Sequence, residues 1–283
     1  MFTTWKTIAA ILTGSGAMLA ESIHSFADSS NQGLLFFGLK ATKKNPDTIH
    51  PLGYGKEIYF WSFIVALILF SMGGLFSIYE GIHKINAHEG LKTPGIAIIV
   101  LLISMVFETA SLYGCVKQIN RLRQNSTLFE WYRSSRQSEL IVVLGEDTAA
   151  LLGLSLALIA VVLSVMTGNP VFDAFGSISI GILLVIVSIL LAVKIKSLLI
   201  GQSTDDETRD IIKGLLGTYP EIDQVLNLIT LQLGPRIMVA VKAKMKKTDS
   251  VEQLIRNINN CESELKKSNP DIQWVFFEPD IDN

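Results

Sequence analysis

Charge and cysteine are both scarce in this sequence. Charged residues make up 18% of the 283 positions, whereas a soluble domain carries about 25%. The 24 basic and 26 acidic residues leave a net charge of −2, so nothing favours nucleic acid as a partner. The two cysteines, Cys115 and Cys261, lie far apart and predict neither a disulfide framework nor a CxxC metal site. Hydrophobic residues reach 49%, with a mean hydropathy of +0.41, which indicates a membrane protein.

The charged residues are concentrated at the C-terminal end of the chain. Residues 205–282 hold ten of the 24 basic and fourteen of the 26 acidic residues. The sequence therefore predicts two domains, a transmembrane domain over residues 1–200 and a polar domain over residues 201–283. The polar domain is large enough for a small core of its own.

Long apolar segments predict membrane-spanning helices, each of which needs about 20 residues. The clearest segments are residues 58–79, 94–116, 148–172 and 174–193. Residues 15–39 are also apolar enough to span, although they contain three ionisable side chains. Residues 1–12 form at most half a span, so we expect a first helix that is truncated at its N-terminus.

Lysine and arginine in the loops predict the orientation. The loops at 40–57 and 117–139 and the end of the last span carry eleven of these residues, and the alternate loops carry two. The positive-inside rule places the first group, and with it the C-terminal domain, in the cytoplasm or the equivalent compartment of an organelle. The number of spans is then even, and six is the simplest count.

The C-terminal domain has an alternating pattern of elements. We expect a helix at 206–219, strands at 224–233 and 236–245, a helix at 250–267 and a strand at 272–278. Gly234-Pro235 supplies a hairpin turn between the first two strands. The predicted fold class is therefore an all-α six-helix membrane bundle, followed by a small cytoplasmic α+β domain of αββαβ order.

Ionisable residues inside the predicted spans are the candidates for function. Glu21, His24 and Asp28 are spaced by three and four residues, so they share one face of a helix. Such groups are costly in hydrocarbon without a partner, which favours metal or proton handling over a structural polar seam. Glu146 and Asp147 lie in an otherwise apolar helix expected over residues 140–164, and as neighbours they point about 100° apart. Either Asp147 completes a site with His24 and Asp28 while Glu146 lies nearer the interface, or Glu146 also turns inward.

The ligand types indicate the metal. An imidazole with two or three carboxylates suits zinc, with manganese or iron as competitors. Because protonation of imidazole competes with metal binding, the same residues offer a route to metal–proton exchange. Glu108, within residues 94–116, is either a further acidic group or a partner for hydroxyls such as Ser111 and Tyr113.

Three motifs resemble a known family. The run His24-Ser25-Phe26-Ala27-Asp28, the loop DTIHPLGYGK at 47–56 and the terminal FEPD at 277–280 resemble the cation diffusion facilitator family of zinc transporters, in the branch that includes a mitochondrial zinc exporter of animals. The resemblance covers nearly the whole chain. It implies a homodimeric metal–proton antiporter whose cytoplasmic domains pair and fold like metallochaperones.

The resemblance also assigns metal ligands. The second-helix pair of the family falls on His24 and Asp28, and its fifth-helix pair falls on Val143 and Asp147. Because valine cannot bind metal, three ligands remain, and histidine at the first position is similar to zinc-preferring members. The fourth place is open to Glu146, Glu21, water or nothing.

A second family site, in a loop, is weakened in this sequence. Asp47 and His50 match it, but Tyr54 stands where the family has its second histidine. A phenol is a poor zinc ligand at neutral pH. We therefore expect this loop chiefly to position Lys56 and Glu57 at the membrane edge.

The cytoplasmic domain is further from the family pattern, because no histidine follows His88. Gln232 and Glu278 stand where zinc-binding members have histidines, and only Asp280 remains as a matching ligand, so we expect little or no regulatory zinc there. His83 and His88, in or near the loop after the third span, are expected to be solvated.

Together these observations predict a secondary transporter, not an enzyme, that exports Zn²⁺ from the cytoplasm in exchange for protons. Zinc is then the transported ion rather than a cofactor. The alternatives are a Mn²⁺ or Fe²⁺ transporter of the same architecture and a metal-binding sensor or scaffold that does not transport. The expected partners are a second copy of the chain and the lipid bilayer. The preferred location is a bacterial inner membrane, with an organelle membrane as the alternative.

Overall fold

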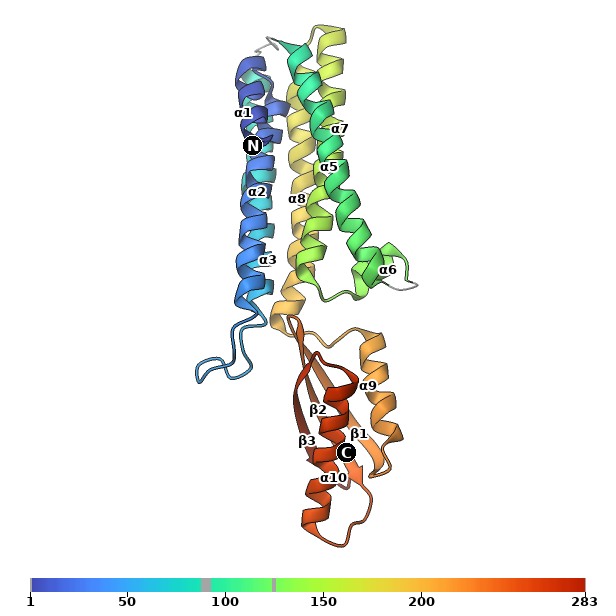
Figure 1. The fold of residues 1–283 in the computed structure, drawn as a ribbon. Helices are drawn as coiled ribbons and strands as arrows, with labels where there is room; N and C mark the ends of the chain where they lie inside the picture. Colours follow the sequence, from blue (N-terminus) through green and yellow to red (C-terminus); the bar gives the residue numbers. More distant parts are fainter. Residues whose placement is uncertain (1, 88–92, 124–125, 283) are drawn as a thin grey trace.

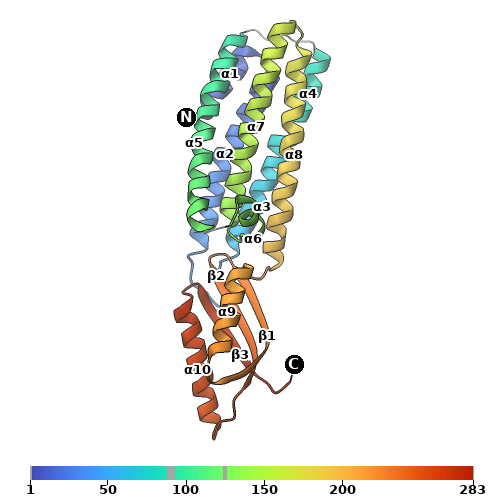
Figure 2. The ribbon, with the colours of Figure 1, turned by 90° about the vertical axis from the view of Figure 1, so that its right-hand side faces the viewer.

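Long helices make up the first two hundred residues of the computed structural model, which describes residues 2–87, 93–123 and 126–282. They are α1 (Phe2–Thr13), α2 (Gly16–Ala41), α3 (Glu57–Ile68), the π-helical η1 (Leu69–Leu75), α4 (Phe76–Ala87), α5 (Pro94–Leu122), α6 (Leu128–Ser134), α7 (Ser138–Thr167) and α8 (Val171–Ile200). Figures 1 and 2 show the longer helices running side by side, with α6 at one end of the bundle.

Four of these helices are long and apolar enough to cross a membrane. They are the continuous stretch Glu57–Ile85, which joins α3, η1 and most of α4, and the helices α5, α7 and α8. They correspond to the four apolar segments of the sequence, so these predicted spans are confirmed. The helices α1 and α2 pack against them (Figure 2). The count of six spans stays a prediction.

The helix α7 begins at Ser138, close to the expected start at residue 140, and it carries Glu146 and Asp147 buried inside the bundle. One predicted boundary is wrong. Residues 117–139, expected as a loop, contain the last turns of α5 and the helix α6. A capping box between Thr127 and Glu130 starts α6, and such a box satisfies backbone N–H groups that the first turn leaves unpaired.

Glycines bring the third span into close contact with α8. A Cβ atom on Gly74 would lie 2.6 Å from a methyl group of Val185, and one on Gly181 would lie 2.6 Å from Ile78. Small residues allow helix backbones to approach in this way within membranes. The contact holds η1 against α8, and a Cβ atom on the neighbouring Gly73 would lie 3.9 Å from His24 Nδ1.

The C-terminal domain consists of α9 (Asp206–Thr218), β1 (Ile222–Leu233), β2 (Arg236–Met245), α10 (Val251–Ser268) and β3 (Ile272–Pro279). The predicted αββαβ order is confirmed. The sheet has the order β1-β2-β3, with β1 and β2 antiparallel and β2 and β3 parallel. Its core joins Ile212 and Leu216 of α9, Cys261 and Leu265 of α10, and the buried face of β2. The domain is therefore two-layered, with both helices on one face of the sheet (Figure 2).

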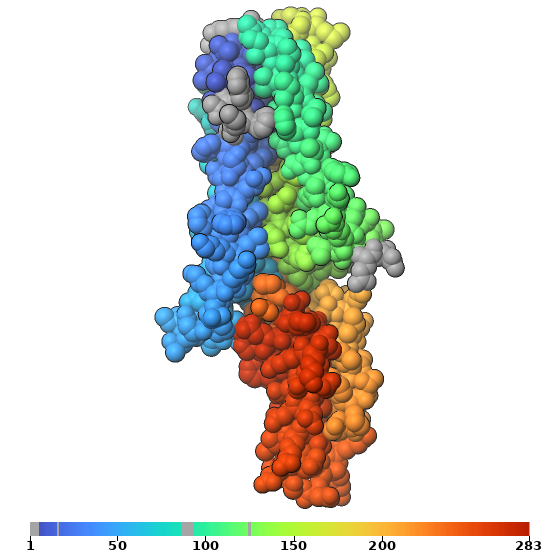
Figure 3. Space-filling model, viewed as in Figure 1, coloured from blue at the N-terminus to red at the C-terminus, as the bar shows by residue number. Residues whose placement is uncertain are grey.

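The domain lies against the end of the bundle that carries the basic loops, and together they form an elongated molecule (Figure 3). At the tip of the β1–β2 hairpin, the Gly234 N–H donates to the Tyr59 hydroxyl at 3.1 Å. Arg136 Nε donates to the Ser203 carbonyl at 2.8 Å. The C-terminal domain thus shares a side of the membrane with these loops, and its assignment to the cytoplasm stays a prediction.

Candidate intramembrane cation site

The helix α2 brings His24 and Asp28 together, as their spacing predicts. The imidazole is 1% exposed, and its Nε2 lies 3.5 Å from Asp28 Oδ2. Within the described part of the chain, neither ring nitrogen of His24 has a hydrogen-bond partner, and neither does Asp28 Oδ1. Because buried polar atoms are nearly always bonded, these atoms have unused capacity to bind a ligand.

The helix α7 contributes Glu146 and Asp147, and both are buried. Asn31 Nδ2 on α2 donates to Glu146 Oε1 at 2.6 Å, and the Ser111 hydroxyl on α5 donates to Asp147 Oδ2 at 3.0 Å. The two carboxylates therefore point to different neighbouring helices, as adjacent helical positions require. Glu146 is buried together with Asp147, as the alternative in which Glu146 also turns inward requires, and whether either residue binds the metal stays a prediction.

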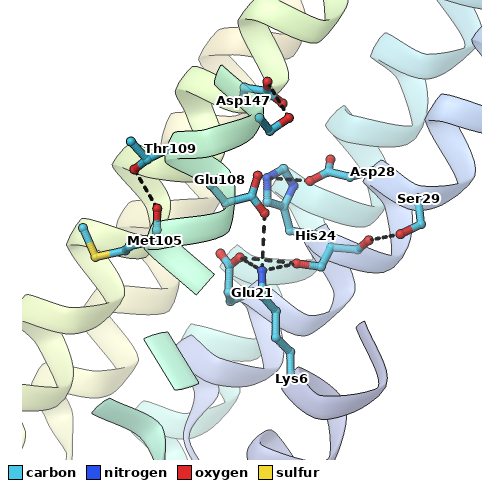
Figure 4. Close-up of polar contacts among 11 residues, drawn as sticks. Lys6, Glu21, His24, Asp28, Ser29, Met105, Glu108, Thr109 and Asp147 are labelled. Atoms are coloured by element: carbon cyan, nitrogen blue, oxygen red, sulfur yellow. Dashed lines mark hydrogen bonds and ion pairs between the residues drawn. The ribbon is translucent and has the colours of Figure 1, made fainter. Parts of the chain in front are cut away.

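A lysine that sequence analysis missed occupies the middle of the polar cluster. Lys6 Nζ on α1 lies 2.9 Å from Glu21 Oε1 and donates to the Ser25 hydroxyl at 2.5 Å. It also lies 3.6 Å from Glu108 Oε1. Figure 4 shows its ammonium group between the carboxylates of Glu21 and Glu108. The signal available in the sequence was an isolated lysine in an apolar helix next to a helix with buried acids, but which helices pair cannot be read from one sequence.

This geometry changes the list of candidate ligands. Glu21 is 0% exposed and forms an ion pair with Lys6, and Glu146 bonds to Asn31. Among the residues that the structure describes, no group of three or more His, Cys, Asp or Glu side chains is arranged to hold a metal ion. The expected ligands are present as an assembled pair, His24 and Asp28, with Asp147 held separately by Ser111.

The loop site is arranged around Asp47. Its carboxylate accepts hydrogen bonds from the backbone N–H groups of Ile49 and His50 and, at 2.6 Å, from the Tyr54 hydroxyl. The Tyr54 hydrogen bond is the main reason why the pKa of Asp47 lies below its usual value. The His50 Nδ1 atom lies 3.6 Å away from Asp47 Oδ1. The structure thus brings the two predicted ligands together, but the carboxylate is already satisfied by its own loop.

The candidates of the C-terminal domain are similarly occupied. Asp280 Oδ2 lies 2.8 Å from Lys242 Nζ, and the hydrogen bond from this lysine lowers the pKa of Asp280. Glu278 pairs in register with Lys242 across β3 and β2. Gln232 donates to the Gly234 carbonyl and so braces the hairpin. Lys242 therefore supplies the positive charge beside Asp280 that a metal ion would otherwise supply.

The remaining histidines lie away from the cluster. His83 on α4 is exposed and stacks on Tyr79, with ring centroids 6.3 Å apart, and its solvation stays a prediction. His88 lies outside the described residues.

Comparisons with known proteins agree with the motifs. The family model for the cation efflux transmembrane domain matches residues 1–200. The mitochondrial proton-coupled zinc antiporter SLC30A9 of Mus musculus is 29% identical over 314 residues, which cover 97% of this chain and 55% of the antiporter. Metal tolerance protein C4 of Arabidopsis thaliana is 31% identical over 236 residues, covering 83% of this chain and 50% of that protein. Magnetosome protein MamB of Magnetospira sp. is 27% identical over 80% of this chain and 66% of its own length. The chain thus spans about half the length of the first two relatives.

Proposed function

The chain belongs to the cation efflux family, and on that premise we propose that it is a secondary transporter that moves a divalent metal cation out of the cytoplasm in exchange for protons. Zn²⁺ is the expected cargo, since a similar protein is named a proton-coupled zinc antiporter. The transmembrane domain, residues 1–200, carries the cation, and residues 201–283 join two copies of the chain into a homodimer.

The observation that carries this proposal is the pair His24 and Asp28. Both lie within α2, the imidazole is buried, and both of its nitrogens lack a hydrogen bond. Histidine and carboxylate are the ligand types that zinc binds in open, exchangeable sites. Asp147 on α7 is the third ligand, and it reaches the pair when α2 and α7 shift relative to each other, as expected of a transporter that alternates its access.

Proton exchange follows from the ligand chemistry. Zinc binds the neutral imidazole and the ionised carboxylate, so each binding event competes with protons at the same atoms. A cation released on one side of the membrane is then replaced by protons. Histidine is the residue that makes this competition effective near neutral pH.

The orientation of the proposed transporter rests on its basic loops. They share one side with the C-terminal domain, and the positive-inside rule makes that side the cytoplasm. With six spans, α1 and α2 are included as membrane helices. A bacterial inner membrane is the preferred location, and an organelle membrane is the alternative.

The carboxylate-rich surroundings favour a second candidate cargo. Glu21, Glu108 and Glu146 lie in the same polar cluster as the expected ligands. Oxygen ligands suit manganese or iron better than they suit zinc. Competition between Zn²⁺, Mn²⁺ and Fe²⁺ for transport would rank them. Manganese displacing zinc at equal concentration would replace our choice of cargo without changing the site.

The test of the proposal is zinc-dependent proton flux in proteoliposomes at several imposed pH gradients. Asp28→Asn and Asp147→Asn should each reduce flux by at least about 100-fold, since loss of a ligand costs more than loss of a group that merely orients one. Asp223→Asn is the matched control, because Asp223 is exposed on the C-terminal domain and pairs only with Lys244 among the described residues.

Two outcomes would contradict the proposal. Zinc binding without flux in the parent protein would favour the sensor or scaffold. Flux that survives in both membrane variants would place the cation path elsewhere.

A further inference from the structure

The helix α5 presents a carboxylate to the same site from a third direction. Glu108 and Ser111 are three residues apart and therefore share one face of this helix. The Ser111 hydroxyl donates to Asp147 at 3.0 Å, so this face points toward the proposed ligand on α7. The Glu108 carboxylate lies 3.6 Å from Lys6 Nζ, which also contacts Glu21 and Ser25 on α2, and this places Glu108 in the polar cluster with α2 and α7 (Figure 4).

The position of Glu108 in the membrane is unusual for a structural carboxylate. It lies at the midpoint of α5 (Pro94–Leu122), and its side chain is 20% exposed. A carboxylate at this depth must face a partner or a water-filled cavity. Its ion pair with Lys6 is long, at 3.6 Å, whereas Lys6 makes short contacts with Glu21 and Ser25. Of the two carboxylates that contact Lys6, Glu108 is therefore the one that leaves the lysine more easily.

The site itself is short of one ligand and has free bonding capacity. Val143, one helical turn before Asp147 on α7, packs with the hydrophobic core and offers no donor atom. Among the described residues, neither nitrogen of His24 has a hydrogen-bond partner, and neither does Glu21 Oε2, although all these atoms are buried. Buried atoms without hydrogen bonds indicate that the polar cluster is built around a further charged species and is not a closed set of internal ion pairs.

We infer that Glu108 is the fourth ligand of the transported cation, in place of Val143, and that Lys6 holds its carboxylate when the cation is not bound. This inference rests on the proposed function. Lys6 is then a tethered cation that competes with the metal for one carboxylate. When a divalent ion binds at His24 and Asp28, Glu108 moves from Lys6 to the metal, and Lys6 remains paired with Glu21. Like charges repel strongly in a site of low dielectric constant, so the lysine also favours release of the metal.

The competition predicts opposite effects of two neutralising substitutions. Glu108→Gln keeps the shape of the side chain and should weaken Zn²⁺ binding by at least about tenfold, because mutations of groups that only orient a ligand already cost that much. Lys6→Met removes the competing charge while keeping an unbranched side chain, and should tighten Zn²⁺ binding several-fold and slow release. Both are measured on the purified full chain by calorimetric titration with Zn²⁺, and release is measured as zinc efflux from proteoliposomes.

A rescue separates a ligand from a structural ion pair. Val143→His adds an imidazole at the position that lacks a donor, so Glu108→Gln combined with Val143→His should recover most of the lost affinity. A static Lys6–Glu108 pair predicts instead that both single variants lower the melting temperature without opposite changes in zinc affinity, and that Val143→His rescues nothing. Either that pattern, or weaker zinc binding in Lys6→Met, would overturn the inference.

Matched control variants, together with Asp28→Asn, distinguish a failure of this inference from a failure of the proposed function. Glu80→Gln makes the same change on α4, and Lys196→Met removes an exposed lysine on α8; neither should alter zinc affinity. If Asp28→Asn abolishes binding while Glu108→Gln leaves it unchanged, the inference fails alone. If Asp28→Asn also has no effect, the proposed site fails with it.

Discussion

The membrane bundle and the regions outside it use the same residue types in different ways. In the bundle, His24 is buried and Asp28 is partly buried, and each has atoms without a hydrogen-bond partner among the described residues. Outside it, Asp47 accepts hydrogen bonds from its own loop, including the one from Tyr54, and Asp280 is paired with Lys242. A carboxylate that the chain already satisfies gains less from a metal than one that it leaves unpaired. Unused bonding capacity, more than residue type, therefore distinguishes the candidate cation site.

Outside the membrane, the lowered pKa values of two carboxylates also show that the chain already stabilises them. The Tyr54 hydroxyl lowers the pKa of Asp47, and Lys242 lowers that of Asp280. In both cases a neighbouring donor stabilises the ionised carboxylate without a metal. The comparison can be tested by breaking the site in the bundle and by restoring the sites outside it.

The largest expected effect comes from removing the imidazole of the bundle site, and removing the imidazole of the loop site is its matched comparison. His24→Asn should abolish zinc transport in proteoliposomes, with a decrease of at least about 100-fold in kcat/KM, because it removes a metal ligand. His50→Asn should change kcat/KM for zinc transport by less than about twofold, since interactions of exposed groups are weak. Equal losses in the two variants would erase the distinction between the buried and the exposed site.

Adding a ligand to the bundle should sharpen its metal preference. Val143→His places a second imidazole one turn from Asp147, and nitrogen ligands favour zinc over manganese. We expect the ratio of zinc to manganese affinity to rise by about tenfold, which corresponds to roughly 1.4 kcal/mol. Competition titrations measure the ratio, and the gain should vanish when Asp147→Asn is combined with it. A gain that persists would mean that the new histidine binds zinc elsewhere.

Restoring the loop site should have a smaller effect on the protein as a whole. Tyr54→His removes the hydroxyl that bonds to Asp47 and supplies the missing imidazole beside His50, whose ring lies 4.3 Å from that of Tyr54. The variant should bind one additional zinc ion in a calorimetric titration, with transport by the bundle unchanged. No additional binding would show that loop geometry, and not only the tyrosine, excludes the metal.

The smallest effect is expected in the C-terminal domain. The pKa of Asp280 is lowered from an ordinary value of 3.8, so its pair with Lys242 stabilises the fold above that pH and is lost as the pH falls through the lowered pKa. Asp280→Asn should therefore speed hydrogen exchange of the β2 and β3 amides slightly at neutral pH, and the difference from the parent chain should shrink as the pH falls through the lowered pKa of Asp280. A difference that persists in acid would mean that Asp280 acts through hydrogen bonds alone.

The elements of the fold were largely predictable. The four apolar segments form long apolar helices, and the αββαβ order of the C-terminal domain was correct. Residues 117–139 were expected as a loop because they are rich in charge, yet they contain the end of α5 and the helix α6. The role of Lys6 was missed because contacts inside a bundle depend on neighbouring helices, which the periodicity of one helix does not reveal.

The sequence by itself determined which side chains share a helix face, because helical spacing is local: His24 and Asp28 meet as expected, and hydropathy alone located the confirmed spans. Only the tertiary structure decided which carboxylates are occupied. It paired Glu21 and Glu108 with Lys6, Glu146 with Asn31 and Asp147 with Ser111, while the His24 nitrogens make no hydrogen bond to the described residues. These contacts join residues on different helices, and their energies depend on distances and burial that arise only when the helices pack.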